Sequence, residues 1–211
     1  MDRWAEATAL LASRDPAMAA FVAAAGPCTL VRRRHPGGPF AALARAILYQ
    51  QLATGAAAAI HGRFAALYGG RPTPEAVAAT PDDDLRAVGL SAAKAASVRH
   101  LAAKVLDGTV RLTRLSRVGD DELVARLCTV RGIGPWTAEM FLMFQLNRPD
   151  VWPVGDLGVR NGYARIHGLG AAPSARDLVT LGDRYRPWRS VAAWYCWRAM
   201  EAGVSPAPAG W

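Results

Sequence analysis

"VRGIGPWTAEMF", residues Val130–Phe141, contains two glycines around one isoleucine, followed by proline, tryptophan and a helix-like pattern. A helical pattern also comes before it, so the stretch predicts two helices joined by a tight hairpin. Glycine adopts positive φ angles at no steric cost and lets another backbone approach closely. With Ile133 directed inward, the N–H groups of the turn and of the next helix would face outward, where they form a site for an anion such as phosphate. A plain helix–helix turn is the alternative, and G-x-G alone does not exclude it.

The composition favours an anionic partner. The chain has 211 residues, 52% of them hydrophobic, enough for one domain or two small ones. The formal net charge of +8 favours nucleic acid or an acidic membrane surface. The lysines are only Lys94 and Lys104, so a general bias toward arginine explains the charge equally well. The cysteines are scattered, which is typical of a protein in a reducing compartment. The sequence shows no signal-peptide core and no apolar run long enough to cross a membrane. We therefore expect a cytoplasmic protein, nucleoid-associated in a bacterium, with no membrane association.

Nearly every segment indicates helix, and the alternation typical of strands is absent. Asp15 and Pro16 predict an N-cap and a first turn, and Gly26 predicts the end of that helix. Ser91 caps another helix, which Gly108 ends. The helices predicted are 16–25, 40–53, 56–68, a short one after 80–81 that begins with three aspartates, 92–106, 120–128, 135–146, 157–166, 175–185 and 187–202. The tail, residues 204–211, is expected to be loosely ordered.

The full string around the hairpin is far more specific than its two glycines. Leu123 and Leu127 precede it, and an aspartate, Asp156, follows further along. In this arrangement the sequence resembles the helix-hairpin-helix (HhH-GPD) DNA glycosylase superfamily. The blocks "AILYQQLATGAAAAIHGRF" and "RPWRSVAAWYCW" extend the resemblance over about residues 40–200. Together the three blocks most resemble the DNA-3-methyladenine glycosylase II branch, which repairs alkylated DNA.

Trp136 stands at the hairpin position where bifunctional relatives, of the endonuclease III and oxoguanine types, carry a catalytic lysine. That lysine attacks the sugar and then cuts the strand, whereas an indole cannot form a Schiff base. The resemblance therefore implies a monofunctional glycosylase with water as the nucleophile and no lyase activity. A core aromatic is the alternative for Trp136, and the two interpretations overlap, because a side chain that lines the pocket can also pack on the helix.

Asp156 follows "VWPVG" and precedes a predicted helix, so sequence alone favours an aspartate N-cap. The resemblance implies instead that it is the catalytic carboxylate. Breaking an N-glycosidic bond builds oxocarbenium charge on the deoxyribose, which a fixed carboxylate stabilises, and the same group can orient or deprotonate water. Gly155 and Leu157 stand where near relatives often have an acidic residue and a tyrosine. These departures leave the catalytic role intact and bear on the shape of the pocket and the choice of substrate.

A glycosylase must extrude its target base, at a cost of a few kcal/mol, and fill the space left behind. Gln50 and Gln51 interrupt an apolar helix at its end, and alignment with the family puts Gln51 at the position of the wedge that enters the duplex. Helix-terminal capping amides are the alternative.

The base pocket is expected to be aromatic. The candidates are Trp136 and Trp197 at matched family positions, and Tyr49, Trp152 and Trp194 by residue type only, for which core packing is the alternative. Arg198 stands after Trp197, where the nearest relatives have tyrosine. The candidates for phosphate contacts are Arg131 and the amides of Gly132 and Gly134, with Arg160 and Arg165 as weaker ones.

The histidines show no ligand spacing, and the acidic runs at 82–84 and 120–122 are typical of helix starts, so no catalytic metal and no cofactor are expected. A monovalent cation held by hairpin carbonyls is a feature of the family, which the sequence leaves open.

The helical pattern predicts an all-α protein, and the resemblance implies a two-lobed helix-hairpin-helix glycosylase fold, with an interleaved chain and an active site in the cleft between the lobes. Residues 1–211 form a single glycosylase unit, with the hairpin at about 120–146. The resemblance implies a monomer that hydrolyses the bond between an alkylated base and deoxyribose in double-stranded DNA, leaving an abasic site in base excision repair. The alternatives are a non-catalytic helix-hairpin-helix DNA-binding module and a glycosylase for deaminated or mismatched bases.

Overall fold

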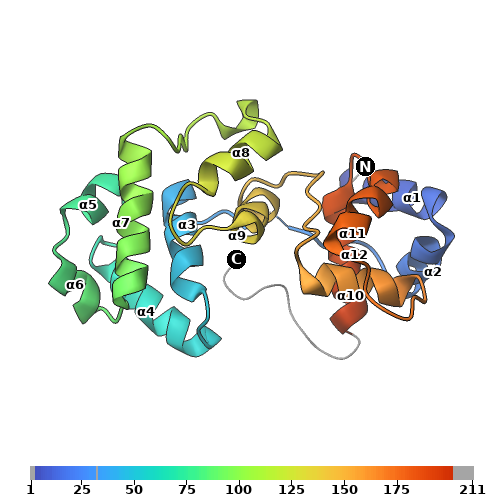
Figure 1. Cartoon of the computed structure of the whole chain (residues 1–211), viewed down its shortest axis with the longest axis horizontal. Coiled ribbons are helices and arrows are strands. Elements are labelled where there is room, and N and C mark those ends of the chain that lie inside the picture. Colours follow the sequence, from blue (N-terminus) through green and yellow to red (C-terminus); the bar gives the residue numbers. More distant parts are fainter. Residues whose placement is uncertain (1–2, 32, 202–211) are drawn as a thin grey trace. The chain divides into compact units, whose positions relative to one another are not determined.

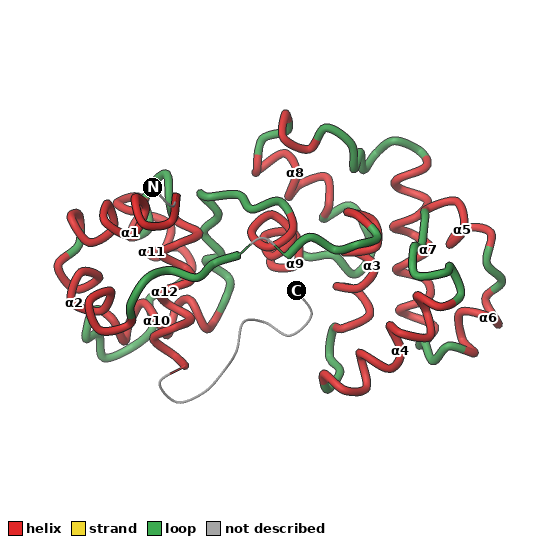
Figure 2. Tube along the Cα trace, turned by 180° about the vertical axis from the view of Figure 1, so that it is seen from behind, coloured by secondary structure: helices red, strands yellow, loops and turns green. Residues whose placement is uncertain are grey.

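Helices and loops make up all of the chain that the computed structural model describes, residues 3–31 and 33–201, and no strand occurs within these ranges (Figures 1 and 2). The described chain divides into two compact units. The terminal unit combines residues 3–31 with 147–201, and the hairpin unit consists of residues 33–146. Because no strand occurs in the described ranges, the predicted all-α class is confirmed. Because the terminal unit takes segments from both sides of the hairpin unit, the predicted interleaved chain is confirmed as well. The predicted loose tail, 204–211, lies outside the described residues.

The hairpin unit is built around one nearly buried helix, α3. Its residues Phe40, Leu43, Ile47 and Leu48 are all less than 7% exposed, and α4, α7 and the turn η2 pack against it. Figure 1 shows α3 between α7 and the helices of the hairpin. The elements of this unit are α3 (Gly38–Tyr49), α4 (Thr54–Ala66), α5 (Pro74–Ala79), α6 (Asp82–Ala87), α7 (Ala92–Leu106), the 3-10 turn η1 (Leu115–Arg117), α8 (Asp120–Leu127), α9 (Pro135–Met140) and the π-helical turn η2 (Phe141–Gln145).

Side-chain caps explain where several of these helices begin. The hydroxyl of Ser91 accepts the N–H of Lys94 at 3.3 Å and starts α7 at the predicted place. Thr73 accepts the N–H of Ala76 at 3.2 Å in the same way and starts α5. This six-residue helix is absent from the prediction, although threonine followed by proline is a start signal there too.

The predicted end of the first helix of this unit is wrong. Helix α3 stops at Tyr49, four residues before Ala53. The backbone is extended at Gln50 (φ −58°, ψ 135°) and left-handed at Gln51 (φ 55°). A positive φ is uncommon for a residue other than glycine and is often found at functional sites. Apolar residues resume at Leu52 and Ala53, directly after the two glutamines, and therefore conceal the break.

The terminal unit depends on a close crossing of two helices. Its elements are α1 (Arg3–Arg14), α2 (Pro16–Ala25), α10 (Leu157–Ile166), α11 (Ala175–Leu181), the 3-10 turn η3 (Asp183–Tyr185) and α12 (Arg189–Glu201). Helices α10 and α12 make the most extensive contact. At their crossing, a Cβ atom on Gly162 would lie only 1.9 Å from the carbonyl oxygen of Cys196. Glycine is therefore required there, because the two backbones touch.

The predicted helix 175–185 is interrupted. Helix α11 ends at Leu181, and η3 follows after Gly182. A Cβ atom on Gly182 would lie 2.2 Å from the indole nitrogen of Trp152, so the ring packs directly on the backbone at the break. The last helix, predicted as 187–202, runs from Arg189 to Glu201, and residue 202 lies outside the described range.

A buried carboxylate joins the two chain segments of the terminal unit. Asp15 caps α2 by accepting the N–H groups of Ala17 and Met18 at 3.0 and 3.1 Å. Its other oxygen contacts Nε2 of His167 at 2.8 Å and accepts the hydroxyl of Tyr185 at 2.5 Å. Asp15 is 2% exposed, so this carboxylate depends on its partners for the interactions that water would provide.

Candidate active site and DNA-binding hairpin

Asp156 is fixed by two N–H groups at one of its oxygens. It is the N-cap of α10, and Oδ1 accepts the backbone N–H of Val159 at 2.8 Å and the indole N–H of Trp197 at 3.1 Å. The residue is 9% exposed. The two interpretations of Asp156, as an N-cap and as a catalytic group, are thus compatible, because the N-cap hydrogen bond sets the position and orientation of the carboxylate. Its catalytic role stays a prediction.

A glycine lets the indole approach this carboxylate. A Cβ atom on Gly158 would lie 3.0 Å from Oδ1 of Asp156 and 3.1 Å from Cδ1 of Trp197. Any larger residue would press between the two side chains. Sequence reasoning did not single out Gly158, whose role depends on a side chain from α12.

Leu157 and Arg198 directly follow Asp156 and Trp197, at positions where the sequence departs from the family pattern. The two residues have different surroundings. Leu157 is 61% exposed, although it directly follows the nearly buried Asp156. Arg198 instead interacts along its own helix: its guanidinium lies 5.7 Å from the ring centroid of Trp194, and it forms an ion pair with Glu201.

Trp152 belongs to the core of the terminal unit. It is 6% exposed, its indole N–H donates to the carbonyl of Leu178 at 2.8 Å, and its ring meets that of Tyr185 edge to face with centroids 6.0 Å apart. Core packing, the alternative given for this residue, describes its position. We therefore leave Trp152 out of the proposed base pocket.

The hairpin has the backbone that its glycines predict. Val130 and Ile133 are 1% and 4% exposed, so the turn is anchored in the core of the hairpin unit. Gly132 has φ 83°, and a Cβ atom there would lie 2.9 Å from Oγ of Ser97 on α7. Gly134 is extended, with φ −97°, and has open space where a side chain would be.

Two candidates on the hairpin are accessible. Trp136 lies in the first turn of α9 and is 36% exposed, which leaves part of its ring available for contact. The side chain of Arg131 is exposed as well. The backbone N–H of Arg131, however, donates to Nδ1 of His100 at 2.8 Å and is therefore used within the protein. The phosphate-binding role of Arg131, Gly132 and Gly134 stays a prediction.

The two glutamines after α3 have separate surroundings. The amide of Gln50 donates to the carbonyl of Gly132 at 2.8 Å and contacts Oγ1 of Thr137 at 3.4 Å, which ties the end of α3 to the hairpin. Gln51 is exposed, in the left-handed conformation noted above. The amide of Gln50 therefore joins the end of α3 to the hairpin and does not cap a carbonyl of α3, whereas Gln51 lies at the surface, as the wedge prediction requires.

Lys94 holds the same segment from α7. Its ammonium donates to the carbonyl of Gln50 at 2.9 Å and to that of Leu48, two of the last carbonyls around the end of α3. A cation is favourable at a helix C-terminus, where the carbonyl oxygens lack helical partners. We call Lys94, Gln50 and Gly132 the wedge brace, after the role predicted for Gln51, because their hydrogen bonds hold the backbone next to Gln51 in place. Sequence reasoning missed Lys94.

Tyr49 lies in the last turn of α3, next to two basic side chains. Its ring is 4.2 Å from the guanidinium of Arg45 and meets the ring of His61 edge to face, with centroids 6.0 Å apart. Its role in the base pocket stays a prediction.

No group of three or more His, Cys, Asp or Glu side chains suited to a metal ion occurs among residues 3–31 and 33–201. Within the same ranges, no helix is both long and apolar enough to cross a membrane.

Comparison with known families identifies the class of protein to which this fold and site belong. The chain belongs to the HhH-GPD superfamily of base excision DNA repair proteins, whose family model matches residues 44–184. The chain is similar to DNA-3-methyladenine glycosylase 1 of Schizosaccharomyces pombe, with 39% identity over 166 residues, 77% of this chain and 73% of that protein. It is 32% identical over 163 residues to DNA-3-methyladenine glycosylase 2 of Escherichia coli, covering 72% of this chain and 55% of that one.

Solved structures agree with this assignment. The S. pombe 3-methyladenine DNA glycosylase in complex with abasic DNA is 34% identical and superposes with a TM-score of 0.80, covering 95% of this chain and all of that one. A DNA-3-methyladenine glycosidase from Bacillus halodurans is also 34% identical, with a TM-score of 0.83 and coverage of 90% and 87%. The predicted family and fold are confirmed.

Proposed function

We propose that this chain is a monofunctional DNA glycosylase that hydrolyses the N-glycosidic bond of alkylated, cationic bases such as 3-methyladenine or 7-methylguanine in duplex DNA. The observation that carries the proposal is the carboxylate of Asp156, nearly buried and held by Val159 and Trp197. The relatives named as 3-methyladenine glycosylases support the choice of substrate. The product is an abasic site.

The carboxylate of Asp156 supplies the charge that the reaction needs. As the bond to the base breaks, the deoxyribose acquires oxocarbenium character, and a negative charge in a site with little water stabilises that transition state strongly. Two N–H donors at Oδ1 keep the carboxylate from turning toward solvent. A group already in place costs little reorganisation when the charge develops. The same carboxylate orients or deprotonates the attacking water.

Trp136 defines the outcome of the reaction. It stands where a lyase would carry the amine that attacks the sugar, and an indole cannot form that covalent bond. The DNA strand therefore stays intact after the base has left. In this proposal Gln51 enters the duplex in place of the extruded base, with the wedge brace keeping its backbone in position.

We also propose that a monovalent cation stabilises the hairpin through its backbone carbonyls. The carbonyls of Val130 and Gly132 already accept hydrogen bonds, from the N–H of Ile133 at 3.0 Å and from the amide of Gln50 at 2.8 Å. A carbonyl oxygen has two lone pairs, so both remain able to bind a cation. Such an ion would fix the turn and take no part in the chemical step.

The Asp156→Asn variant tests the proposed site. Asparagine is as good an N-cap as aspartate, so the fold should be kept while the charge is lost. We expect base release from a duplex containing 7-methylguanine to fall by at least about 1,000-fold, since a charge-stabilising group of this kind contributes about 4 kcal/mol. Affinity for DNA should stay equal or rise, because a negative charge has been removed. Release at the wild-type rate would refute the assignment, and Asp183→Asn, an exposed carboxylate of the same unit, is the matched control.

The product of the wild-type protein tests the monofunctional mechanism. Intact abasic strands should accumulate, and they should break only after alkali or heat. A covalent protein–DNA adduct trapped by borohydride would contradict it. A panel of duplexes with one defined lesion each separates the alternatives: no release from any lesion would identify a DNA-binding module, and preferred release of uracil or hypoxanthine would identify a glycosylase for deaminated bases.

A further inference from the structure

One face of α7 carries three polar side chains that meet the hairpin and the end of α3. Lys94, Ser97 and His100 follow one another at intervals of three residues, a spacing that places them on the same side of a helix. Lys94 belongs to the wedge brace, and Ser97 lies against the backbone of Gly132. The reaction proposed above gives no part to His100, the third side chain of this face.

His100 holds the first N–H group that follows α8 and its buried end, Val130. Its Nδ1 accepts the backbone N–H of Arg131 at 2.8 Å. A backbone N–H can only donate, so Nδ1 must be the ring nitrogen without a proton, and the proton lies on Nε2. An imidazole in this form carries no charge. The contact therefore fixes the backbone of the hairpin and adds no charge for a phosphate.

This bond divides the N–H groups of the hairpin into two sets. Those of Val130 and Ile133 donate to nearby carbonyls at 3.0 Å each, and the one that follows Val130 donates to His100. The N–H groups of Gly132 and Gly134 have no acceptor within residues 3–31 and 33–201, and both glycines are exposed. The two amides predicted to bind phosphate are thus those that the described part of the protein leaves available.

The direction of the N–H of Gly132 depends on the peptide planes on either side of it. Only two dihedral angles separate consecutive planes, so a fixed plane limits the one next to it. The preceding plane carries the N–H of Arg131, which His100 holds. The following plane carries the carbonyl of Gly132, which accepts the amide of Gln50 at 2.8 Å. The plane that presents the N–H of Gly132 is therefore set from both sides.

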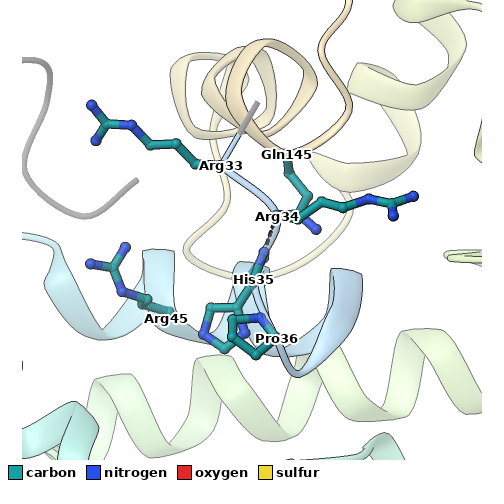
Figure 3. A pocket seen from close by; sticks show the side chains of 7 residues that line it. Arg33, Arg34, His35, Pro36, Arg45 and Gln145 are labelled. Carbon is teal, nitrogen blue, oxygen red and sulfur yellow. Dashed lines mark hydrogen bonds between the residues drawn. The ribbon is translucent and has the colours of Figure 1, made fainter. Parts of the chain in front are cut away.

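The second helix of the hairpin has a similar anchor at its far end. Helix α9 continues into η2, and together they run from Pro135 to Gln145, about 15 Å. There, Oε1 of Gln145 accepts the backbone N–H of His35 at 2.9 Å, the bond drawn as a dashed line in Figure 3. Gln145 is 5% exposed. This bond holds the helix in the same manner as His100 holds the turn, but it lies away from the glycines.

We propose that His100 is a positioning residue for DNA binding, which acts through the N–H of Arg131 to direct the amide of Gly132 toward a phosphate. The proposal rests on the proposed function and on the phosphate site predicted at the hairpin. It gives α7 two tasks: Lys94 supports the segment that carries Gln51, and His100 sets the turn that binds the strand. His100 therefore acts on the affinity for DNA and leaves the chemical step unchanged.

His100→Leu and His100→Asn test this role at one position. The side-chain oxygen of asparagine is as many bonds from the backbone as Nδ1 and accepts a hydrogen bond, whereas leucine accepts none. The Kd for a duplex with an abasic-site analogue should rise about 3- to 10-fold in His100→Leu, the range for one lost hydrogen bond, and stay near the wild-type value in His100→Asn. The single-turnover rate of base release at saturating DNA should be unchanged in both variants.

Three further measurements separate positioning from other roles. Helix stability cannot produce the expected order, because leucine is a better helix former than asparagine, and Tm is measured for both. The slope of log affinity against log salt should be unchanged in both variants, since no charge is lost. In NMR spectra of the wild-type protein, the ring of His100 should carry its proton on Nε2. Gln145→Met removes the acceptor at the far end of the helix and should lower Tm without changing Kd.

Several results would overturn the proposal. A wild-type Kd for His100→Leu, or a Kd for His100→Asn as high as that of His100→Leu, would exclude positioning through a hydrogen-bond acceptor. A salt slope lower by about one in both variants would identify His100 as a charged contact to phosphate instead. An equal rise in Kd for Gln145→Met would make His100 a general anchor of the fold. Base release by the wild-type protein is measured in parallel, so failure of the proposed function is recognised separately from failure of this role.

Discussion

The indole N–H of Trp197 donates a hydrogen bond to Oδ1 of Asp156 at 3.1 Å, across the contact between α12 and the start of α10. Two hydrogen-bond donors thus fix the position of the carboxylate: the backbone N–H of Val159 in α10 and the indole of Trp197 in α12. Any change in how α12 lies on α10 is expected to move the group on which the proposed chemistry depends.

Trp197→Phe removes this donor and keeps an aromatic ring. A hydrogen bond to a charged group is worth about 1.5–3 kcal/mol, so the rate of base release should fall about 10- to 100-fold if the bond orients the carboxylate in the transition state. KM and affinity for undamaged DNA should change little. Trp188→Phe, which alters a tryptophan of the same unit that packs edge to face on Trp4, is the control and should retain the wild-type rate. Equal rates for both variants would show that the indole serves only for packing.

Gly162→Ala should destabilise the protein strongly. The added methyl group would lie 1.9 Å from the carbonyl oxygen of Cys196, a backbone atom that cannot rotate away, so the two helices must separate. Overpacking of this kind costs about 3 kcal/mol, or about 6–12 °C in Tm for a chain of this length. Base release should fall as well, because Asp156 and Trp197 lie on these helices.

Gly170→Ala controls for the change of residue type, since the Cβ position there is open and the φ angle is not positive. It should leave Tm within about 1 °C of the wild-type value. A Tm for Gly162→Ala equal to that of Gly170→Ala would contradict the close crossing of α10 and α12.

The starts of helices could be predicted because their signals are local. Asp15 with Pro16, Ser91 and Asp156 cap the residues that directly follow them, and a side chain that bonds an N–H three residues on needs no knowledge of the tertiary fold. The same reasoning would have found α5 from Thr73 and Pro74. The hairpin was predicted for a similar reason, because Gly132 needs its positive φ whatever packs around it.

The wedge brace could not be predicted in this way. Lys94 lies 44 residues from the carbonyl of Gln50 that it binds, and nothing near Lys94 in the sequence indicates that partner. For the same reason the end of α3 was placed too late: apolar residues resume at Leu52 after the two glutamines, and the contacts of this segment with α7 and the hairpin are not visible in the sequence. The roles predicted for Trp197 and Asp156 come only from the family resemblance, and the contact between the two side chains is likewise invisible in the sequence.

Lys94→Met should weaken base extrusion. It removes the donor to the carbonyls of Leu48 and Gln50 and keeps a side chain of similar length, so Gln51 loses part of its support. We expect the single-turnover rate of base release to fall about 10-fold, in line with about 1.5 kcal/mol for a bond to a charged group. The fluorescence change of 2-aminopurine placed opposite or beside the lesion, which reports unstacking, should shrink in parallel.

Lys104→Met is the matched control for charge, because Lys104 lies on the same helix and pairs at 3.8 Å with Asp107 at the surface. It should lower DNA affinity as much as Lys94→Met through the lost charge, and leave the unstacking signal unchanged. If both variants extrude the base equally well, Lys94 has no positioning role.

Acid should destabilise the terminal unit through Asp15. Burial alone would raise its pKa, but hydrogen bonds from His167, Tyr185 and the N–H of Met18 outweigh burial and lower the pKa from 3.8 to about 2. A carboxyl group with a depressed pKa in the folded state stabilises the protein above its unfolded pKa, and that contribution is lost as the pH falls from about 4 to about 2. Asp15→Asn should therefore be less stable than wild type at pH 7.

Urea unfolding at pH 7, 4, 3 and 2 measures this contribution. The free energies of wild type and Asp15→Asn should differ most at pH 7 and converge toward pH 2. Asp82→Asn, which removes a carboxylate from an exposed pair with Arg99, should follow the wild-type curve closely. A difference between wild type and Asp15→Asn that is the same at every pH would exclude linkage to this carboxyl group.

The last prediction concerns the choice of substrate. An alkylated purine such as 3-methyladenine or 7-methylguanine carries a positive charge that weakens its glycosidic bond, so little protonation of the leaving group is required. Trp136 is partly exposed, and a cationic base stacked on its ring would gain about 0.5–2 kcal/mol over a neutral base, a factor of a few to about thirty. The weak bond must supply the rest of the selectivity. Trp136→Leu should therefore lower the ratio of 7-methylguanine to hypoxanthine release by about 3- to 30-fold, with a smaller loss of DNA affinity, whereas Trp136→Phe, which keeps a ring, should retain most of it. Faster release of neutral lesions than of the two methylated purines by the wild-type protein would refute this substrate assignment and leave the role of Asp156 untouched.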